Sequence, residues 1–173
     1  MKKIAIIGAG CTGKSTLARE LGEILKLPVY HLDTFYWKPG WVKTPTEEWE
    51  KVMINLVSKD KWIIDGSYEK SIDIRLKQAD TVIFLDYPTY ISLFRFMKRY
   101  LKYRGKSRPD IAPDCEERLD FQFISWLINY RKNKRPDVLK KLNAINKNKQ
   151  VHIITSPRKL QKFLDTLKSN SNI

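Results

Sequence analysis

The sequence predicts an α/β fold, a three-layer α/β/α sandwich around a five-stranded parallel sheet, together with a helical lid. Two observations predict the sandwich: five short apolar runs have the length of buried strands, and amphipathic helical patterns lie between them. Strands that alternate with helices in this way form parallel sheets covered on both faces. Because 173 residues is the size of one domain, we expect residues 1–173 to form a single domain.

The first half of the chain predicts two strands and two helices. Residues 4–7 are a continuous apolar strand, and a helix with one apolar face begins at residue 14 and ends before residue 28. Residues 28–32 form a second strand, and an aromatic loop follows it. Residues 44–47, Thr-Pro-Thr-Glu, match a capping box with proline at the first helical position, which predicts a second helix behind them.

The second half predicts three more strands, at residues 62–65, 82–86 and 151–155. A weaker helical stretch joins the third strand to the fourth, and a long basic helix over residues 89–103 follows the fourth. The polar segment 105–115 contains two prolines and predicts a mobile loop. Apolar residues then recur at helical spacing, Pro136 breaks or kinks that helical pattern, and Pro157 opens a last helix.

The composition is that of a globular protein. With 42% hydrophobic and 12% aromatic residues, the chain can bury a core, which excludes a disordered polypeptide. Two distant cysteines, Cys11 and Cys115, are too few for a disulfide framework, and no apolar run approaches the roughly 20 residues of a membrane span. We therefore expect a cytoplasmic protein without a membrane partner, and the sequence leaves its oligomeric state open.

The strongest motif is Gly-Ala-Gly-Cys-Thr-Gly-Lys-Ser at residues 8–15, which fits the phosphate-binding P-loop pattern between a strand and a helix. Glycines allow a tight path that turns backbone N–H groups towards a phosphate, and the helix N-terminus attracts the same charge. We expect Lys14 to reach the β- and γ-phosphates of ATP and Ser15 to bind Mg²⁺. The predicted nucleotide-binding residues of this loop are Gly8, Ala9, Gly10, Cys11, Thr12, Gly13, Lys14, Ser15 and Thr16.

Two aspartates end predicted strands, at the edge where a parallel sheet binds its ligands. Either Asp65 or Asp86 could hold the hydration shell of Mg²⁺, and either could instead cap a helix. We prefer Asp65, acting through water, because Gly66 lets the chain turn away without crowding a nucleotide.

The charge balance is strongly basic, with 33 Lys and Arg against 19 Asp and Glu, a net charge of +14. Such a field attracts polyanions, so we expect non-specific nucleic-acid binding. Arg95, Arg99 and Lys102 share one face of the predicted basic helix. Three interpretations stay open: a lid insert at about residues 95–135 that closes arginines over phosphates, a solvated basic helix, or a nucleic-acid patch with interleaved tyrosines. Three further arginines could complete the lid from its far side: Arg118, Arg131 and Arg135.

In combination, the P-loop, Asp65-Gly66 and residues 79–88 resemble the adenylate-kinase-like branch of P-loop kinases, which contains nucleoside and nucleotide kinases. The likeness implies that Arg95 and Arg99 are lid arginines that touch the ATP phosphates, and that Arg158 lies near the adenine. The closer resemblance is to bacterial FlaR-like DNA topology modulation proteins. That second likeness rests on Leu32-Asp33, Trp41, residues 62–68, Arg75 and Ala79-Asp80.

The phosphate-acceptor side departs from the adenylate-kinase pattern. Residues 67–69 are Ser-Tyr-Glu where that family has an arginine clamp; Arg75 could substitute for it, or could pair with a neighbouring aspartate. Residues 31–36 resemble the segment of uridine kinases and small-metabolite kinases whose carboxylate receives a hydroxyl proton, which implies this role for Asp33; the alternative is that Asp33 caps a turn. The aromatic residues after Asp33 could stack a base or sugar, or form a satellite core. The predicted acceptor-binding residues are Asp33, Trp41 and Arg75.

Two functions stay open. The sequence favours a phosphotransferase that moves the γ-phosphate of ATP, with Mg²⁺ as cofactor, to a small-molecule acceptor: a nucleoside, a nucleotide or another hydroxyl metabolite. Its predicted catalytic residues are Lys14, Asp33, Arg95 and Arg99. The alternative is an ATP-binding, DNA-associated topology modulation protein without small-molecule kinase activity. An acceptor-side carboxylate together with a lid favours the first function.

Overall fold

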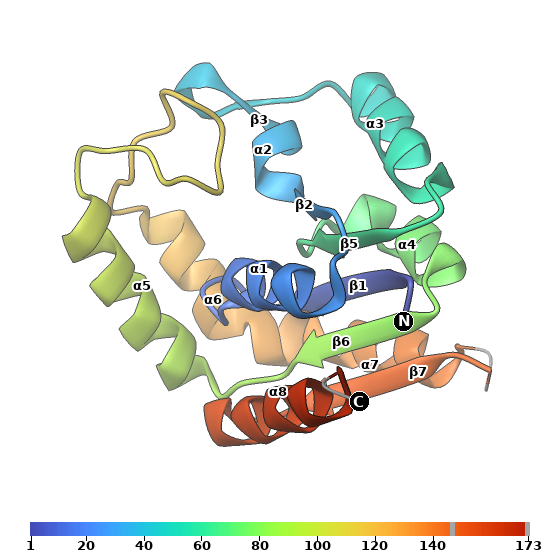
Figure 1. The fold of residues 1–173 in the computed structure, drawn as a ribbon. Helices are drawn as coiled ribbons and strands as arrows, with labels where there is room; N and C mark the ends of the chain where they lie inside the picture. Colours follow the sequence, from blue (N-terminus) through green and yellow to red (C-terminus); the bar gives the residue numbers. More distant parts are fainter. Residues whose placement is uncertain (146–147, 172–173) are drawn as a thin grey trace.

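A parallel sheet with helices on both faces forms the centre of the molecule (Figure 1). The computed structural model describes residues 1–145 and 148–171. Within these residues the strands are ordered β2–β5–β1–β6–β7, and all of them run parallel. Their bounds are β1 (Lys3–Gly8), β2 (Val29–His31), β5 (Trp62–Asp65), β6 (Thr81–Leu85) and β7 (Gln150–Ile154). This arrangement confirms the predicted three-layer α/β/α sandwich with a five-stranded parallel sheet.

Strand register brings three carboxyl ends together at one edge of the sheet. In β1, Ile6 pairs with Asp65 of β5, and Asp65 in turn pairs with His31 of β2. Because parallel strands end at the same edge, the segments that follow β1, β2 and β5 begin side by side. The sheet thereby gathers the loop after Gly8, the start of α2 (Leu32–Tyr36) and Asp65 itself.

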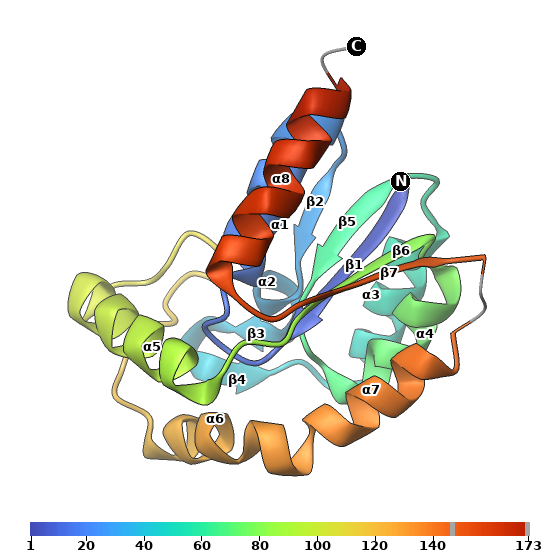
Figure 2. The same ribbon diagram turned by 90° about the horizontal axis from the view of Figure 1, so that it is seen from below.

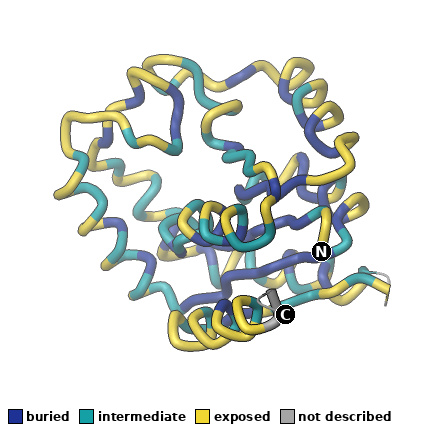
Figure 3. Tube along the Cα trace, viewed as in Figure 1, coloured by how far each residue is buried: buried dark blue, intermediate teal, exposed yellow. Residues whose placement is uncertain are grey.

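Alternate residues of the strands bury against two different helical layers. Ile4 and Ile6 of β1 pack in the cluster that includes α1 (Lys14–Leu25) and α8 (Pro157–Ser171). Ala5 and Ile7 pack on the other face, against α3 (Thr46–Ser58), α4 (Ile72–Gln78) and α7 (Arg135–Asn143). Figure 2 shows α1 and α8 on one side of the sheet, and Figure 3 shows the buried strands between exposed helical surfaces. No helix in the described residues is long and apolar enough to cross a membrane.

Two helices stand beside the carboxyl edge of the sheet, and a long segment connects them. The helix predicted at residues 89–103 is α5 (Thr89–Tyr103), which packs on α6 (Phe121–Asn133) through Phe96 and Phe123. This pair encloses Ala9 of the P-loop in a small apolar cluster. Pro136 lies in the first turn of α7, directly after α6 ends, so the predicted break is confirmed.

The segment that connects α5 to α6, residues 104–120, packs more closely than its polar sequence predicts. Ile111, Ala112 and Cys115 are buried and form a cluster with Trp37 and Trp41. Isolated bridges pair Arg104 and Ser107 near its start with Glu117 and Glu116 near its end, respectively. The segment is therefore anchored by its packing on Trp37 and Trp41.

Two local predictions in the first half are wrong. The expected aromatic loop is a short helix, α2, followed by β3 (Trp37–Lys38), the 3₁₀ turn η1 (Pro39–Trp41) and β4 (Val42–Lys43). The expected capping box does not form, because Pro45 is the N-cap of α3 and the Thr44 hydroxyl donates instead to the Phe35 carbonyl, at 2.9 Å. The weak helical stretch is the 3₁₀ turn η2 (Glu69–Ser71) followed by α4.

Candidate functional site

The loop of residues 8–15 connects β1 to α1 in a shape that its own side chains stabilise. Gly13 has φ of 93°, in the left-handed region that favours glycine, and it is the N-cap of α1. The buried Thr12 hydroxyl donates to the Ala9 carbonyl at 2.9 Å, and the Lys14 Nζ donates to the same oxygen at 2.7 Å. Burial lowers the pKa of Lys14, whereas nearby Asp33 and Asp65 counteract that shift.

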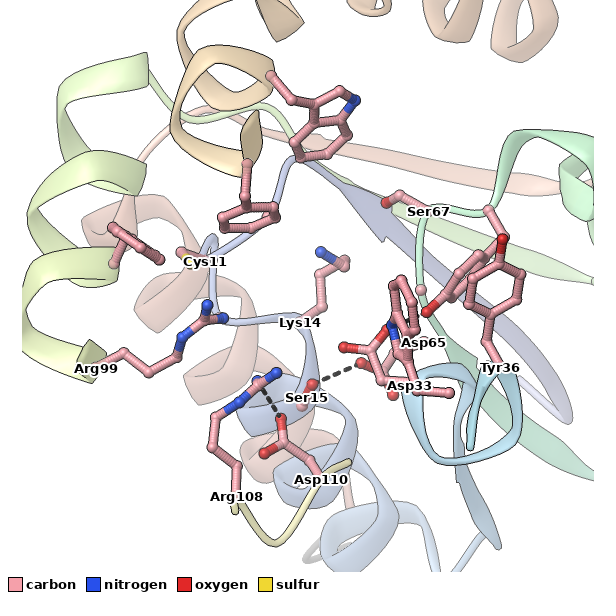
Figure 4. Close-up of a pocket in the computed structure, with 18 of the residues that line it drawn as sticks. Cys11, Lys14, Ser15, Asp33, Tyr36, Asp65, Ser67, Arg99, Arg108 and Asp110 are labelled. Carbon is pink, nitrogen blue, oxygen red and sulfur yellow. Dashed lines mark hydrogen bonds and ion pairs between the residues drawn. The ribbon is translucent and has the colours of Figure 1, made fainter. Parts of the chain in front are cut away.

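A cavity of about 870 Å³ lies over this loop, and most of the predicted site residues line it (Figure 4). Its volume is within the range typical of small-molecule sites. The predicted residues that line it are Gly10, Cys11, Gly13, Lys14, Ser15, Thr16, Asp33, Trp41, Asp65, Arg95 and Arg99. The predicted residues outside its lining are Gly8, Ala9, Thr12, Arg75 and Arg158.

At Gly10 the loop passes very close to α6. A Cβ atom built on Gly10 would lie 2.5 Å from Cζ of Phe123 in α6. Only glycine allows this approach without a shift of the ring or the loop. The back of the P-loop therefore packs directly against α6.

Asp65 lies at the end of β5, buried, and contacts two side chains. Its Oδ2 accepts a hydrogen bond from the Ser15 hydroxyl at 2.8 Å, and its Oδ1 lies 2.5 Å from Nδ1 of His31. Burial alone would lower the pKa of His31, but the Asp65 carboxylate raises it above the ordinary value. A hydroxyl and a carboxylate this close are the oxygen donors that Mg²⁺ prefers, so the residues present fit this ion.

Asp33 faces the same cavity as Lys14 (Figure 4), from the first turn of α2. Its Oδ1 accepts a hydrogen bond from the Tyr68 hydroxyl at 2.6 Å. Burial and the Asp33 carboxylate both raise the pKa of Tyr68, so that hydroxyl keeps its proton and remains a donor. The α2 helix has no side-chain cap bond at its N-cap, His31, and the Thr34 hydroxyl donates to the His31 carbonyl. Asp33 thus contacts Tyr68, and both side chains line the cavity.

Arginines from two segments reach the cavity on the P-loop side. The Arg95 Nη1 donates to the Thr12 carbonyl at 2.5 Å, so this side chain is attached to the P-loop itself. Arg99 and Arg108 both contact the buried Glu117. The carboxylate of Asp110 also lines the cavity, 3.6 Å from Nη1 of Arg108.

Sequence reasoning missed Asp110 and Glu117, because acidic residues in a polar loop carry no pattern that distinguishes them from solvated ones. The arginine-rich helix beside them was the available signal, since buried or cavity-facing guanidinium groups need carboxylate partners.

The remaining candidate lid arginines divide into two groups. Arg118 lines the cavity with its guanidinium 5.7 Å from the Trp41 ring. Arg131 and Arg135 instead bind Asp86, at distances of 3.2 Å and 2.8 Å, outside the cavity lining. The Asp86 carboxylate is thus occupied by two cations that attach α6 and α7 to the end of β6, and it does not reach the Ser15–Asp65 pair.

Arg75 does not line the cavity, as a residue that binds the acceptor would. Its side chain is fully buried and donates to the carbonyls of Gly66, Tyr68 and Ser71, at 2.6, 3.2 and 3.4 Å. Neither of its neighbouring aspartates is its partner: Asp73 binds Lys141, and Asp80 accepts from the backbone N–H groups of Lys2 and Lys3. Burial lowers the pKa of Arg75 to about 10, which leaves it charged at neutral pH. In this position Arg75 holds the turn that follows β5, and the acceptor-binding role stays a prediction.

Arg158, expected beside the adenine, is exposed in the first turn of α8 and does not line the cavity. Of the aromatic residues after Asp33, Tyr36, Trp37 and Trp41 line it and Phe35 does not. Tyr36 contacts Trp49 and Tyr68 with ring centroids 5.1 Å and 4.3 Å apart, and Trp37 contacts Trp41 at 5.3 Å. They form both a small core and the wall of the cavity nearest Asp33.

Comparison with known proteins gives a relative of unknown activity and a group of structural neighbours. No protein-family profile matches the chain. The uncharacterized protein YqaC of Bacillus subtilis is 32% identical over 133 residues, which cover 75% of this chain and 72% of that protein.

The structural neighbours are kinases. Shikimate kinase from Acinetobacter baumannii, in complex with shikimate, has a TM-score of 0.61 at 21% identity over 98% of this chain and 94% of that one. A gluconokinase from Sinorhizobium meliloti has a TM-score of 0.54 at 15% identity over 98% and 94%. Deoxyadenosine kinase from M. mycoides with bound dATP has a TM-score of 0.50 at 16% identity over the whole of both chains. The chain therefore has the fold of P-loop kinases, whereas the expected likeness to topology modulation proteins stays a prediction.

Proposed function

The chain belongs to the family of the uncharacterized protein YqaC of Bacillus subtilis, and because that name carries no activity, we propose its function from the site itself. We propose a kinase that transfers the γ-phosphate of ATP to a hydroxyl group of a small molecule. The observation that carries the proposal is that Lys14, the Ser15–Asp65 pair and Asp33 line one cavity. A nucleotide-binding protein without transfer chemistry has no use for the last of these.

The P-loop would bind the phosphates of ATP. Its backbone N–H groups and the N-terminus of α1 attract the phosphate charge, and Lys14 exchanges its hydrogen bond with the Ala9 carbonyl for the β- and γ-phosphates. Thr12 keeps the loop in shape through its bond to Ala9. Ser15 and Asp65 would hold Mg²⁺, which when bound neutralises charge that develops on the phosphates.

Asp33 would orient the acceptor hydroxyl and take its proton as the bond to phosphorus forms. Support comes from its position in the cavity and from the Tyr68 hydroxyl, which fixes one carboxylate oxygen. Trp41 and the neighbouring rings would form the apolar wall of the acceptor site. We propose a nucleoside, a nucleotide or another hydroxyl metabolite as the acceptor. The structural neighbours are kinases of shikimate, gluconate and deoxyadenosine by name, and all three acceptors carry hydroxyls.

Residues of about 95–135 would act as a lid in the same domain. They include the C-terminal part of α5, the connecting segment and α6, and they bring Arg95 and Arg99 to the cavity. Arginines in this position neutralise charge on the transferring phosphoryl group and help to exclude water.

The binding test compares Lys14→Ala with Lys51→Ala, which removes an equal charge from an exposed position of α3. We expect Lys14→Ala to weaken binding of a non-hydrolysable ATP analogue at least about tenfold by isothermal titration calorimetry, and Lys51→Ala to leave it unchanged. Normal binding by Lys14→Ala would overturn the assignment of the P-loop.

The acceptor is identified by a thermal-shift screen of nucleosides, nucleotides and sugar acids in the presence of the analogue, followed by ADP-release assays on the hits. If ATP binds and no acceptor promotes ADP release, the kinase proposal fails. Duplex DNA that binds sequence-selectively at physiological salt would then favour the topology-modulation alternative.

A further inference from the structure

Glu117 connects two arginines that come from different segments. Its Oε1 lies 3.0 Å from Nε and 2.8 Å from Nη2 of Arg99 on α5, and its Oε2 lies 2.9 Å from Nε of Arg108. The carboxylate therefore uses one oxygen for each guanidinium. The Arg99 contact has hydrogen-bond geometry and so fixes the orientation of that guanidinium as well as its distance, whereas the Arg108 contact is a short ion pair without hydrogen-bond geometry.

The Glu117 side chain is 3% exposed, and its backbone is fixed as well. Its N–H donates to the Lys106 carbonyl at 3.0 Å, and its carbonyl accepts from the Gly105 N–H at 3.4 Å. A buried carboxylate costs free energy unless cations compensate it, and here two cations do. The position of Glu117 is thus set by the fold of segment 104–120, and it can set the position of the arginines in turn.

Both arginines lie close to the P-loop, and Figure 4 shows Arg99 and Arg108 with their guanidinium groups turned towards Lys14 and Ser15. Burial raises the pKa of Cys11 in the loop, while the positive charges of Arg99, Lys14 and Arg108 act in the opposite direction. Two cations beside a phosphate loop repel each other, and a carboxylate between them offsets that repulsion. Arg99, Arg108 and Glu117 together carry one net positive charge, which the Asp110 carboxylate, 3.6 Å from Arg108 in the cavity lining, partly offsets.

We infer that Glu117 is a positioning residue, which holds Arg99 and Arg108 as one pair directed at the β- and γ-phosphates of the nucleotide. The inference rests on the proposed function, because it presupposes ATP on the P-loop. Glu117 also lines the cavity, but a carboxylate repels the phosphates, so we assign its effect to the arginines that it holds. Guanidinium groups already held in place bind a phosphate at a smaller entropic cost than free side chains.

The test compares Glu117→Gln with Glu116→Gln, which removes the same charge one residue away at an exposed position. Calorimetry measures binding of a non-hydrolysable ATP analogue and of AMP to each full-length protein. For Glu117→Gln we expect analogue binding to weaken about tenfold or more and AMP binding to stay within about twofold of wild type. Glu116→Gln should change neither. Unchanged or tighter analogue binding by Glu117→Gln would overturn the inference, since removal of a nearby negative charge alone strengthens anion binding.

A double-variant cycle separates positioning from general structural damage. In an Arg99→Ala/Arg108→Ala background, Glu117→Gln should weaken analogue binding less than about twofold, because the groups it acts through are gone. An equal loss in both backgrounds would contradict a role through the arginines. Glu117→Asp keeps the charge with a shorter reach and covers the case in which Glu117→Gln does not fold; its analogue affinity should lie below that of wild type, and an unchanged affinity overturns the inference.

The two hypotheses fail in different ways. If the wild-type protein binds no ATP analogue, the proposed function is wrong and the inference falls with it. If the wild type binds the analogue and Lys14→Ala does not, while Glu117→Gln binds normally, the function stands and only the role of Glu117 is rejected.

Discussion

Asp33 is the residue on which the proposed chemistry depends most. Asp33→Asn is nearly isosteric and still accepts the hydrogen bond from Tyr68 through its amide oxygen, but it cannot take a proton. We expect turnover with the identified acceptor to fall about 10²-fold or more while affinity for the ATP analogue is retained. Steady-state ADP release and calorimetry measure the two quantities.

Asp60→Asn at an exposed position is the matched control for this change. Tyr68→Phe removes the hydrogen bond to Asp33 but leaves the Asp33 carboxylate in place. It should therefore lower turnover less than Asp33→Asn does. Near wild-type turnover in Asp33→Asn would remove Asp33 from the mechanism.

A substitution of Arg75 tests whether this single residue stabilises the fold. Arg75→Met keeps much of the side-chain volume but leaves the carbonyls of Gly66, Tyr68 and Ser71 without this donor. The Tyr68 carbonyl keeps its bonds from Ser71, but a buried carbonyl left without any donor costs about 1–3 kcal/mol, so we expect the free energy of unfolding to fall by about 3 kcal/mol in urea titrations. An unchanged unfolding free energy together with a raised KM for the acceptor would restore the acceptor-binding interpretation.

At the scale of elements, Asp80 links the start of β6 to the start of β1. Burial would raise the pKa of its carboxyl, but hydrogen bonds from the Thr81 hydroxyl and from the N–H groups of Lys2 and Lys3 lower it below the ordinary value. A carboxyl group whose pKa is lower in the folded state than in the unfolded state stabilises the fold at pH values above the unfolded-state pKa. This stabilisation is lost as the pH falls through the folded-state pKa.

We therefore expect Asp80→Asn to lower the melting temperature at pH 7 and to have little effect well below the ordinary carboxyl pKa of about 3.9. Thermal unfolding of both proteins across the acidic range measures this. Asp165→Asn on the exposed surface of α8 serves as the control. A difference between the Asp80 variant and wild type that persists unchanged into acid would show that the carboxyl charge is not what matters.

The elements predicted best from sequence are those buried on both faces. The runs at residues 4–7, 62–64 and 82–85 are apolar throughout because every side chain packs against a helical layer. Sequence patterns did not predict α2 and the β3–β4 hairpin, because their few aromatic residues show neither helical nor strand periodicity. These residues gain their structure from packing on Trp49 and Tyr68. The capping box failed because a tertiary contact with Phe35 takes the Thr44 hydroxyl.

The candidate site divides in the same way. Lys14, Ser15, Asp33 and Asp65 follow directly from motif and strand end, since local sequence decides where they lie. Glu117 and Asp110 depend on how segment 104–120 folds back over the cavity, and nothing local in the sequence encodes that path.

At the scale of the whole molecule, the net charge of +14 makes a prediction independent of the site. Duplex DNA of mixed sequence should bind weakly at low salt, and its binding constant should fall linearly on logarithmic axes as salt increases, because binding releases counterions. Fluorescence anisotropy with two unrelated duplexes over about 50–200 mM salt checks it. Equal slopes and affinities for both duplexes are expected, and a preference for one of them that survives at the upper salt limit would contradict a purely electrostatic interaction.

The close approach of Gly10 to Phe123 has a consequence for how this chain can evolve. Any side chain at position 10 needs the space that the Phe123 ring fills. A larger residue at position 10 should therefore be tolerated only together with a smaller one at position 123. Gly10→Ala should destabilise the protein, and Phe123→Leu in the same chain should recover part of that loss, as chemical denaturation of the two single variants and the double variant will measure. Purely additive effects would mean that the loop and the helix adapt independently. Among natural relatives we accordingly expect covariation between these positions, with small residues at 123 wherever position 10 is not glycine.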